Sequence, residues 1–376
     1  MQGTEIPHRI LGSLKIVILI IVLSKLLVFG LGFSVTYAVD GPAPPLSILM
    51  NQFYHWDSLH YMNIATSWYV NQGDSRSNIV FFPLYPLIVR LITFNSSFTN
   101  LFALLVSNVS SIFAAIYLFK LAKLDFSERI ATRAVLYMCI FPTAFFLSAI
   151  YPEGLFLALA IASFYYARTE RWPLAGVLSL FAALTRIGGL ILFPTLLIEY
   201  LQRKQWNTRK ISPTILWTSL SLLGFLIYLV LNNQVTGNLF SFAKFEQIYW
   251  NQSLNPLIGL QDAILRSVAG SFPQNVYGSV QIVFAVAGLL AVAACFVLRF
   301  RLSYNVYMLL TWLLCVSTSW WNSIPRYMLA MFPMFILLGI PDRGKRMTPL
   351  IVVTIISFLA SLILFTILFA LNIFVF

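Results

Sequence analysis

The sequence predicts an all-α polytopic membrane protein, and three observations lead to this class. Hydrophobic residues make up 60% of the 376 residues and charged residues only 10%. The mean hydropathy is +0.85, and an ordinary soluble domain carries roughly 25% charge. Basic residues gather in clusters that recur at every second loop between apolar segments, as the positive-inside rule requires. The positive-inside rule therefore accounts for the net charge of +12, and we expect no nucleic-acid partner.

About eleven transmembrane helices are expected from the apolar segments. They lie near 14–37, 100–120, 132–151, 153–168, 172–186, 189–202, 213–235, 276–298, 303–320, 326–340 and 348–372. With a cytoplasmic N-terminus, this order places the basic clusters inside and the C-terminus outside. The first segment is predicted to be a retained anchor, because no small-x-small cleavage site follows a short apolar core and the segment contains Lys25.

Two long outer loops are expected in a single membrane domain that spans 1–376. They are 38–100 and 236–275, and the first is predicted to carry the catalytic region. Its start, Gly41-Pro42-Ala43-Pro44-Pro45, ends the helix of the first span, because proline cannot continue a helix. Segments 49–69 and 86–94 are predicted to form short helices whose aromatic faces lie along the membrane interface.

Asp57 is one of only 12 acidic residues, and it lies in an aromatic run that follows the first span. On a helix, Asp57, His60 and Tyr61 share one face. A carboxylate in this setting predicts a base that acts on a substrate held at the membrane surface. The alternative is an ordinary carboxylate on a helix surface. Asp57 with His55 and His60 offers metal ligands in principle, but the spacing matches no strong motif, so we expect no metal.

A second isolated acid, Glu153, lies at the tip of a tight hairpin between two apolar segments. One interpretation is a solvated turn residue that the dipole of the following helix favours. The other is burial among helices for function, since ionisable residues within membranes are costly and commonly functional. Both interpretations place Glu153 on the outer side.

Three basic residues on the predicted outer side lie in or near apolar surroundings: Arg186, Lys244 and Arg326. Guanidinium groups offer a planar fork to two phosphate oxygens, so these residues together predict a phosphate clamp. The alternative is that the arginines extend to lipid headgroups, as long basic side chains do at membrane interfaces.

The order of these motifs resembles the PIG-V mannosyltransferase family, which adds the second mannose to glycosylphosphatidylinositol precursors, and its prokaryotic relatives. The likeness covers roughly residues 50–340. It rests on Trp56-Asp57, the run Phe-Phe-Pro-Leu-Tyr-Pro-Leu at 81–87, the hairpin at 148–156, Leu184-Thr185-Arg186 and, more loosely, Ile324-Pro325-Arg326-Tyr327. The chain departs from the family at Ile187-Gly188, where a polar residue often follows the Thr-Arg pair.

The resemblance implies a GT-C glycosyltransferase-type fold that takes a sugar from a polyprenyl phosphate, such as dolichyl-phosphate mannose. It implies inverting transfer to a lipid-linked or glycan acceptor on the non-cytoplasmic face, without a cofactor. Catalytic roles fall to Asp57 and Glu153. The predicted substrate-binding residues are His55, Trp56, His60, Tyr85, Arg186, Lys244 and Arg326. We expect the plasma membrane in a prokaryote or the endoplasmic reticulum in a eukaryote.

Two other functions are compatible with the composition. The first is a polytopic transporter or flippase of lipid-linked sugars, but transporters usually contain internal repeats and charged sites at mid-membrane. No duplication is visible here, and apart from Lys25 the isolated charges lie at the ends of spans. The second is a GT-C enzyme that uses a different lipid-linked donor.

Overall fold

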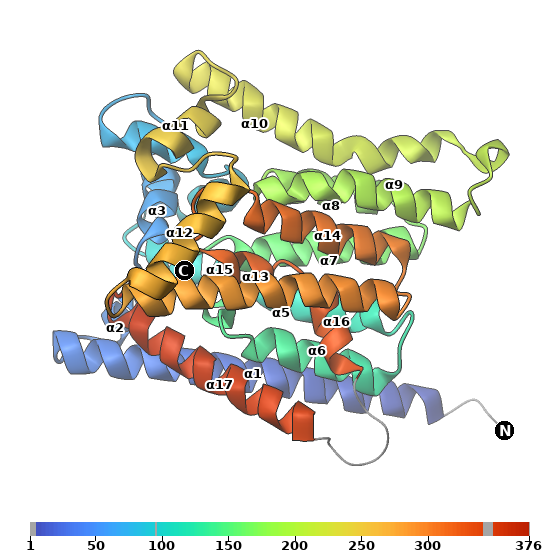
Figure 1. Ribbon diagram of the computed structural model, residues 1–376, viewed down its shortest axis with the longest axis horizontal. Coiled ribbons are helices and arrows are strands. Elements are labelled where there is room, and N and C mark those ends of the chain that lie inside the picture. The colour runs from blue at the N-terminus through green and yellow to red at the C-terminus, as the bar shows by residue number, and fades with distance from the viewer. Residues whose placement is uncertain (1–4, 95, 341–348, 376) are drawn as a thin grey trace.

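The computed structural model describes residues 5–94, 96–340 and 349–375, and every regular element in these ranges is a helix. In Figure 1 the long helices run across the bundle, with α10 along one edge and α1 along the other. Five described helices are long and apolar enough to cross a membrane, at Lys15–Asp40, Thr99–Ala122, Pro213–Thr236, Gln274–Val297 and Pro349–Ala370. The chain is therefore a polytopic membrane protein. The predicted count of eleven spans is not confirmed, because the remaining apolar helices are shorter.

The bundle consists of long helices and of shorter ones that fill its interior. The long helices are α1 (Glu5–Asp40), α5 (Thr99–Ala122), α10 (Leu220–Thr236), which follows η5 (Pro213–Ser219), α13 (Gln274–Val297) and α17 (Pro349–Ala370). The interior helices are α6 (Glu128–Ile140), α7 (Glu153–Arg168), α8 (Trp172–Ala183), α9 (Leu192–Arg203), α14 (Leu302–Val316) and α16 (Pro333–Gly339).

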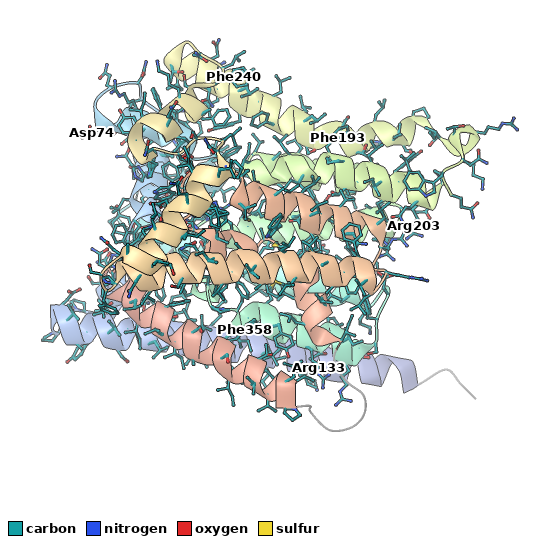
Figure 2. All side chains as sticks on the ribbon, viewed as in Figure 1. Asp74, Arg133, Phe193, Arg203, Phe240 and Phe358 are labelled. Carbon is teal, nitrogen blue, oxygen red and sulfur yellow. The ribbon has the colours of Figure 1, made fainter. Side chains whose placement is uncertain are left out.

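Short helices gather at one end of the bundle. They are α2 (Pro45–Asn51), α3 (Asp57–Ser67), η1 (Asp74–Val80), α4 (Leu84–Thr93), η2 (Ala144–Leu147), η3 (Ile187–Ile191), α11 (Ser241–Trp250), α12 (Pro256–Ala269) and α15 (Ile324–Met328). A further short helix, η4 (Thr208–Lys210), lies in the connection between α9 and η5. Figure 2 labels Asp74 at the first end and Arg133 and Arg203 at the other. We call these the Asp74 end and the Arg203 end.

The structure corrects several predicted boundaries. The helix expected over 49–69 is two helices, because α2 ends at Asn51 and α3 begins at Asp57. The span expected over 326–340 is divided into α15 and α16, and the span expected over 132–151 already ends at Ile140. Pro142 explains that end, because the residue before a proline is driven into extended backbone. The loop expected over 236–275 contains the helices α11 and α12.

Helix α7 lies at the centre of the packing. It packs against α5, α8 and α9, and nearly all of its side chains are buried. At Gly154 the two helices α5 and α7 approach so closely that an added Cβ would lie 2.7 Å from the carbonyl oxygen of Ser107. Small residues permit such crossings in membranes. The crossing fixes the first turn of α7, and therefore Glu153, within the bundle.

Lys25 is a charged residue inside the first span, and it has a local structural role. Its Nζ donates to the carbonyl oxygen of Leu147 at 2.8 Å and to Ser148 Oγ at 3.0 Å. These bonds tie α1 to the end of η2, in the hairpin that leads to α7. A buried ammonium group requires such partners.

An ion network holds the Arg203 end together. The fully buried Glu199 of α9 accepts hydrogen bonds from Arg301 Nε at 2.9 Å, Arg301 Nη2 at 2.8 Å and Ser303 Oγ at 2.7 Å. Arg168, the last residue of α7, donates to both carboxylate oxygens of Asp125 at 2.5 and 2.7 Å. Arg168 Nε also lies 3.3 Å from Glu199 Oε1, so the network joins α7, α9 and the start of α14. Arg168 and Arg301, which belong to the basic clusters of the predicted loops, therefore also hold helices together.

Glu199→Gln is expected to lower the free energy of unfolding by about 3 kcal/mol, because it removes a charge that compensates the buried guanidinium group of Arg168 and the partly buried one of Arg301. Thermal denaturation of the purified protein in detergent measures this loss. Glu170→Gln is the matched control: the Glu170 side chain is 57% exposed and lies 3.6 Å from Arg203, so its loss is expected to change little. Equal melting temperatures for the two variants would contradict the role of Glu199.

Candidate active site

Four charged side chains meet at the Asp74 end. Arg326 of α15 lies at the centre, with its Nη1 2.5 Å from Asp57 Oδ2 and its Nε 2.5 Å from Glu153 Oε1. Arg186, directly before η3, pairs with the same oxygen of Glu153 through its Nη1. Two carboxylates and two guanidinium groups from four segments of the chain therefore form one cluster, which carries no net formal charge.

Backbone contacts fix the position of Arg326. The amide of Ile324 donates to Gln281 Oε1 of α13 at 3.0 Å, and Thr143 Oγ1 donates to the carbonyl oxygen of Pro325 at 3.0 Å. The guanidinium group lies over the rings of Phe146 and Tyr151, at 4.9 and 4.6 Å from their centroids. Aromatic faces attract a cation in this geometry. Arg326 is buried, so it does not extend to lipid headgroups.

Asp57 begins α3 after a residue with unusual backbone geometry. Trp56 has φ +56°, a conformation that costs a non-glycine residue about 1–3 kcal/mol. Its indole ring packs edge-to-face against Phe374, with 5.1 Å between the centroids. This sharp entry directs the first side chain of α3 toward Arg326. Asp57 and Tyr61, which the sequence places on one face of a helix, both contribute to the wall of a cavity.

Glu153 begins α7 and is only 4% exposed, so it is not a solvated turn residue. The helix dipole favours a negative charge at this position. Its Oε1 receives both guanidinium groups, whereas Oε2 is buried and has no hydrogen-bond partner among the described residues. A buried oxygen of this kind is costly unless a ligand or water satisfies it.

A cavity opens beside the cluster, and its empty space measures about 1460 Å³ when the open solvent at its mouth is included. Asp57, Glu153, Arg186 and Arg326 line its polar part. Apolar side chains of α7 and α14, such as Phe156, Leu157 and Leu314, line another part. A cavity with one charged region and an apolar wall suits an amphipathic ligand that has a charged head.

Five of the nine predicted site residues line this cavity, and four do not. The five are Trp56, Asp57, Glu153, Arg186 and Arg326. The other four are His55, His60, Tyr85 and Lys244. Lys244 is exposed on α11, so the structure does not bring it to the two arginines. The phosphate clamp stays a prediction: of its three residues, Arg186 and Arg326 line the cavity, and both are paired with carboxylates.

Three of the other predicted residues support the site from behind the wall. Tyr85 is fully buried, and its hydroxyl group lies 3.0 Å from the carbonyl oxygen of Ala103 and 2.9 Å from Ser107 Oγ. His60 Nδ1 lies 2.8 Å from Asn78 Oδ1, and the ring stacks on Phe81. The ring of His55 packs against Phe369. Their roles in substrate binding stay predictions.

The cavity wall also contains residues that the sequence did not single out. Glu246 and Trp250 come from α11, and Phe374 and Val375 come from the segment after α17. The sequence offered one signal for Glu246, namely the scarcity of acids on the predicted outer side. Among the described residues, no group of three or more His, Cys, Asp or Glu side chains is placed to hold a metal ion.

Comparison with protein-family models matches residues 43–232, half of the chain, to a family described as Mannosyltransferase (PIG-V). The matched range contains Asp57, Glu153 and Arg186, whereas Arg326 and Glu246 follow it. No curated protein matches the chain. Three of the four residues in the charged cluster thus lie both in the matched range and in the cavity wall.

Proposed function

Because the chain belongs to the Mannosyltransferase (PIG-V) family, and is thus a membrane mannosyltransferase, we propose a specific donor, acceptor and site for its reaction. The mannosyl group comes from a polyprenyl-phosphate donor and passes to a hydroxyl group of a lipid-linked or glycan acceptor. The reaction takes place at the Asp74 end, on the non-cytoplasmic face. The observation that carries this proposal is the cluster of Asp57, Glu153, Arg186 and Arg326 at the edge of an apolar-walled cavity.

The donor fits the two parts of the cavity. A polyprenyl phosphate has a long apolar chain and an anionic head, and Phe156, Leu157 and Leu314 offer an apolar wall beside the two guanidinium groups. Such a donor already carries its leaving group, so the reaction needs no nucleotide site. This agrees with a sequence that has neither a glycine-rich phosphate loop nor an Asp-x-Asp motif.

The arginines would stabilise the departing phosphate. Charge develops on the phosphate oxygens as the bond to the anomeric carbon breaks, and pre-positioned guanidinium groups offset it most effectively where water is excluded. Both groups contact carboxylates in the structure, so a phosphate must compete for them. When Arg326 turns one nitrogen toward the phosphate, the oxygen of Asp57 that it leaves can accept a hydrogen bond from the acceptor hydroxyl group.

The chemical step is a single displacement that inverts the anomeric carbon. The acceptor oxygen bonds to that carbon, the bond to the phosphate oxygen breaks, and the polyprenyl phosphate departs with the electron pair. Asp57 takes the proton of the acceptor hydroxyl group, a role worth about 10²–10⁴ in rate. Glu153 keeps its contacts with both guanidinium groups and so holds them in place during the transfer.

Asp57→Asn is expected to abolish mannosyl transfer while the protein still folds, because the amide keeps the size of the side chain but cannot take a proton. The assay is transfer from radiolabelled polyprenyl-phosphate mannose to extracted lipid and glycan acceptors in membranes. Asp74→Asn, at an exposed position of η1, is the matched control. If Asp57→Asn retained more than about a tenth of wild-type turnover, Asp57 would not be the essential base.

Arg326→Lys is expected to impair transfer strongly although it keeps the positive charge, because a single ammonium group cannot bridge Asp57, Glu153 and a phosphate at once. Arg326→Gln is expected to be worse, by on the order of 10²-fold or more in kcat/KM. Turnover and donor affinity are measured at matched expression and melting temperature. Near-normal activity of the lysine variant would remove Arg326 from the phosphate site.

The Asp74 end is expected to face away from the cytoplasm, because the basic clusters lie in the opposite loops. Single cysteines at Asp74 and at Arg209 of η4, in an otherwise cysteine-free protein, are therefore expected to react with a membrane-impermeant maleimide from opposite sides. Sealed vesicles of known orientation provide the measurement. Labelling of both positions from the same side would contradict the proposed location of the reaction.

A further inference from the structure

A third carboxylate, Glu246 of α11, lines the same cavity and differs from the other two. Asp57 and Glu153 each contact a guanidinium group at hydrogen-bond distance. Within the described ranges, no basic nitrogen lies within 4.0 Å of the Glu246 carboxylate. The cavity therefore has a part beside α7 and α15 where four charged side chains are paired, and a part beside α11 with a carboxylate that has no basic partner among the described residues.

Two further side chains complete the part beside α11. Trp250 ends α11, and Gln252 follows two residues later, and both line the cavity. The indole ring of Trp250 meets Phe81 and His60 edge-to-face, at 5.8 and 5.7 Å between centroids. His60 lies one turn after Asp57 in α3, so Trp250 is held next to the helix that carries the proposed base.

The chain around these side chains is fixed to the rest of the protein. The amide of Ser319 donates to the carbonyl oxygen of Ser253 at 2.8 Å, and the amide of Ser253 donates to Ser319 Oγ at 2.9 Å. On the other side, Arg76 of η1 lies over the ring of Tyr249. These contacts hold Gln252 against the segment that carries Trp320, which also lines the cavity.

We propose that Glu246, Trp250 and Gln252 form the subsite that holds the acceptor, and that it takes the ring of a neutral polyhydroxylated molecule. Hydroxyl groups on adjacent carbons can donate to the carboxylate and the amide oxygen, while the apolar face of the ring packs on the indole. The negative charge of Glu246, which has no basic partner among the described residues, disfavours a phosphate here. This inference rests on the proposed function, because it assigns the α11 side of the cavity to the acceptor of that reaction.

The ionisation of Glu246 is expected to make the KM for the acceptor depend on pH. Burial raises the pKa of Glu246 to about 7, and the negative charge of Asp57 adds to the effect. Below this pH the protonated carboxyl group loses acceptor capacity, so the KM for the acceptor is expected to rise as the pH falls through 7. The titratable and charged groups on the surrounding elements are Asp57 of α3, Tyr327 of α15, Tyr228 of α10, and Asp74 and Arg76 of η1.

The experiment uses the full chain in lipid nanodiscs, with polyprenyl-phosphate mannose as donor and octyl α-mannoside as the acceptor probe. Glu246→Gln is expected to raise the acceptor KM at least about tenfold at pH 8 and to abolish its dependence on pH. The donor KM is expected to stay within about twofold of wild type. Gln247→Ala, at an exposed position of the same helix, is the matched control and is expected to leave every parameter unchanged.

Different outcomes separate this inference from the proposed function. An unchanged acceptor KM in Glu246→Gln, or a rise in donor KM instead, would overturn the subsite while leaving mannosyl transfer intact. Preference for a serine-containing peptide over octyl α-mannoside would overturn it as well. Loss of folding is excluded by the melting temperature, and Glu246→Asp provides a second variant, with a smaller rise in acceptor KM expected. If octyl α-mannoside quenched the tryptophan fluorescence of the wild-type protein but no mannose was transferred, the subsite would stand and the proposed reaction would be wrong.

Discussion

The site depends on one buried cation. Arg326 connects Asp57 of α3 with Glu153 of α7. Its guanidinium group also lies over the rings of Phe146 and Tyr151. A guanidinium group in an apolar bundle is costly without carboxylate partners, and a buried carboxylate is equally costly without a cation. Each partner is therefore needed by the other. This mutual requirement fixes three elements that are far apart in the sequence, and it explains why the start of α3 can hold Trp56 in a strained conformation.

Helix α7 couples the two charged ends of the bundle. Glu153 at its first residue belongs to the cavity cluster, and Arg168 at its last residue belongs to the network with Asp125. Sixteen helical residues separate the two ends by about 24 Å. Glu153 lies at the positive end of the helix dipole and Arg168 at the negative end, so the dipole favours both charges.

The cavity is assembled from both halves of the chain. The family match ends at residue 232, within α10, and covers Asp57, Glu153 and Arg186. The elements that follow it contribute Arg326, the apolar wall of α14, the α11 region with Glu246, and Phe374 after α17. The matched half thus supplies the carboxylates of the charged cluster and the other half supplies the arginine that organises them.

The sequence alone determined the class of protein and the identity of its isolated charges. Composition and the alternation of basic clusters predicted a polytopic helical membrane protein, and α7 has the bounds that its apolar run predicted. Asp57, Glu153, Arg186 and Arg326 could be singled out because an ionisable group in an apolar segment is costly and so has a reason to be there. Only the tertiary structure decided how they pair. Asp57 and Arg326 are 269 residues apart, and their contact depends on how α3 and α15 pack, which no local periodicity encodes. The same is true of Glu246 and Trp250, because a side chain becomes part of a cavity wall only when distant helices close around it.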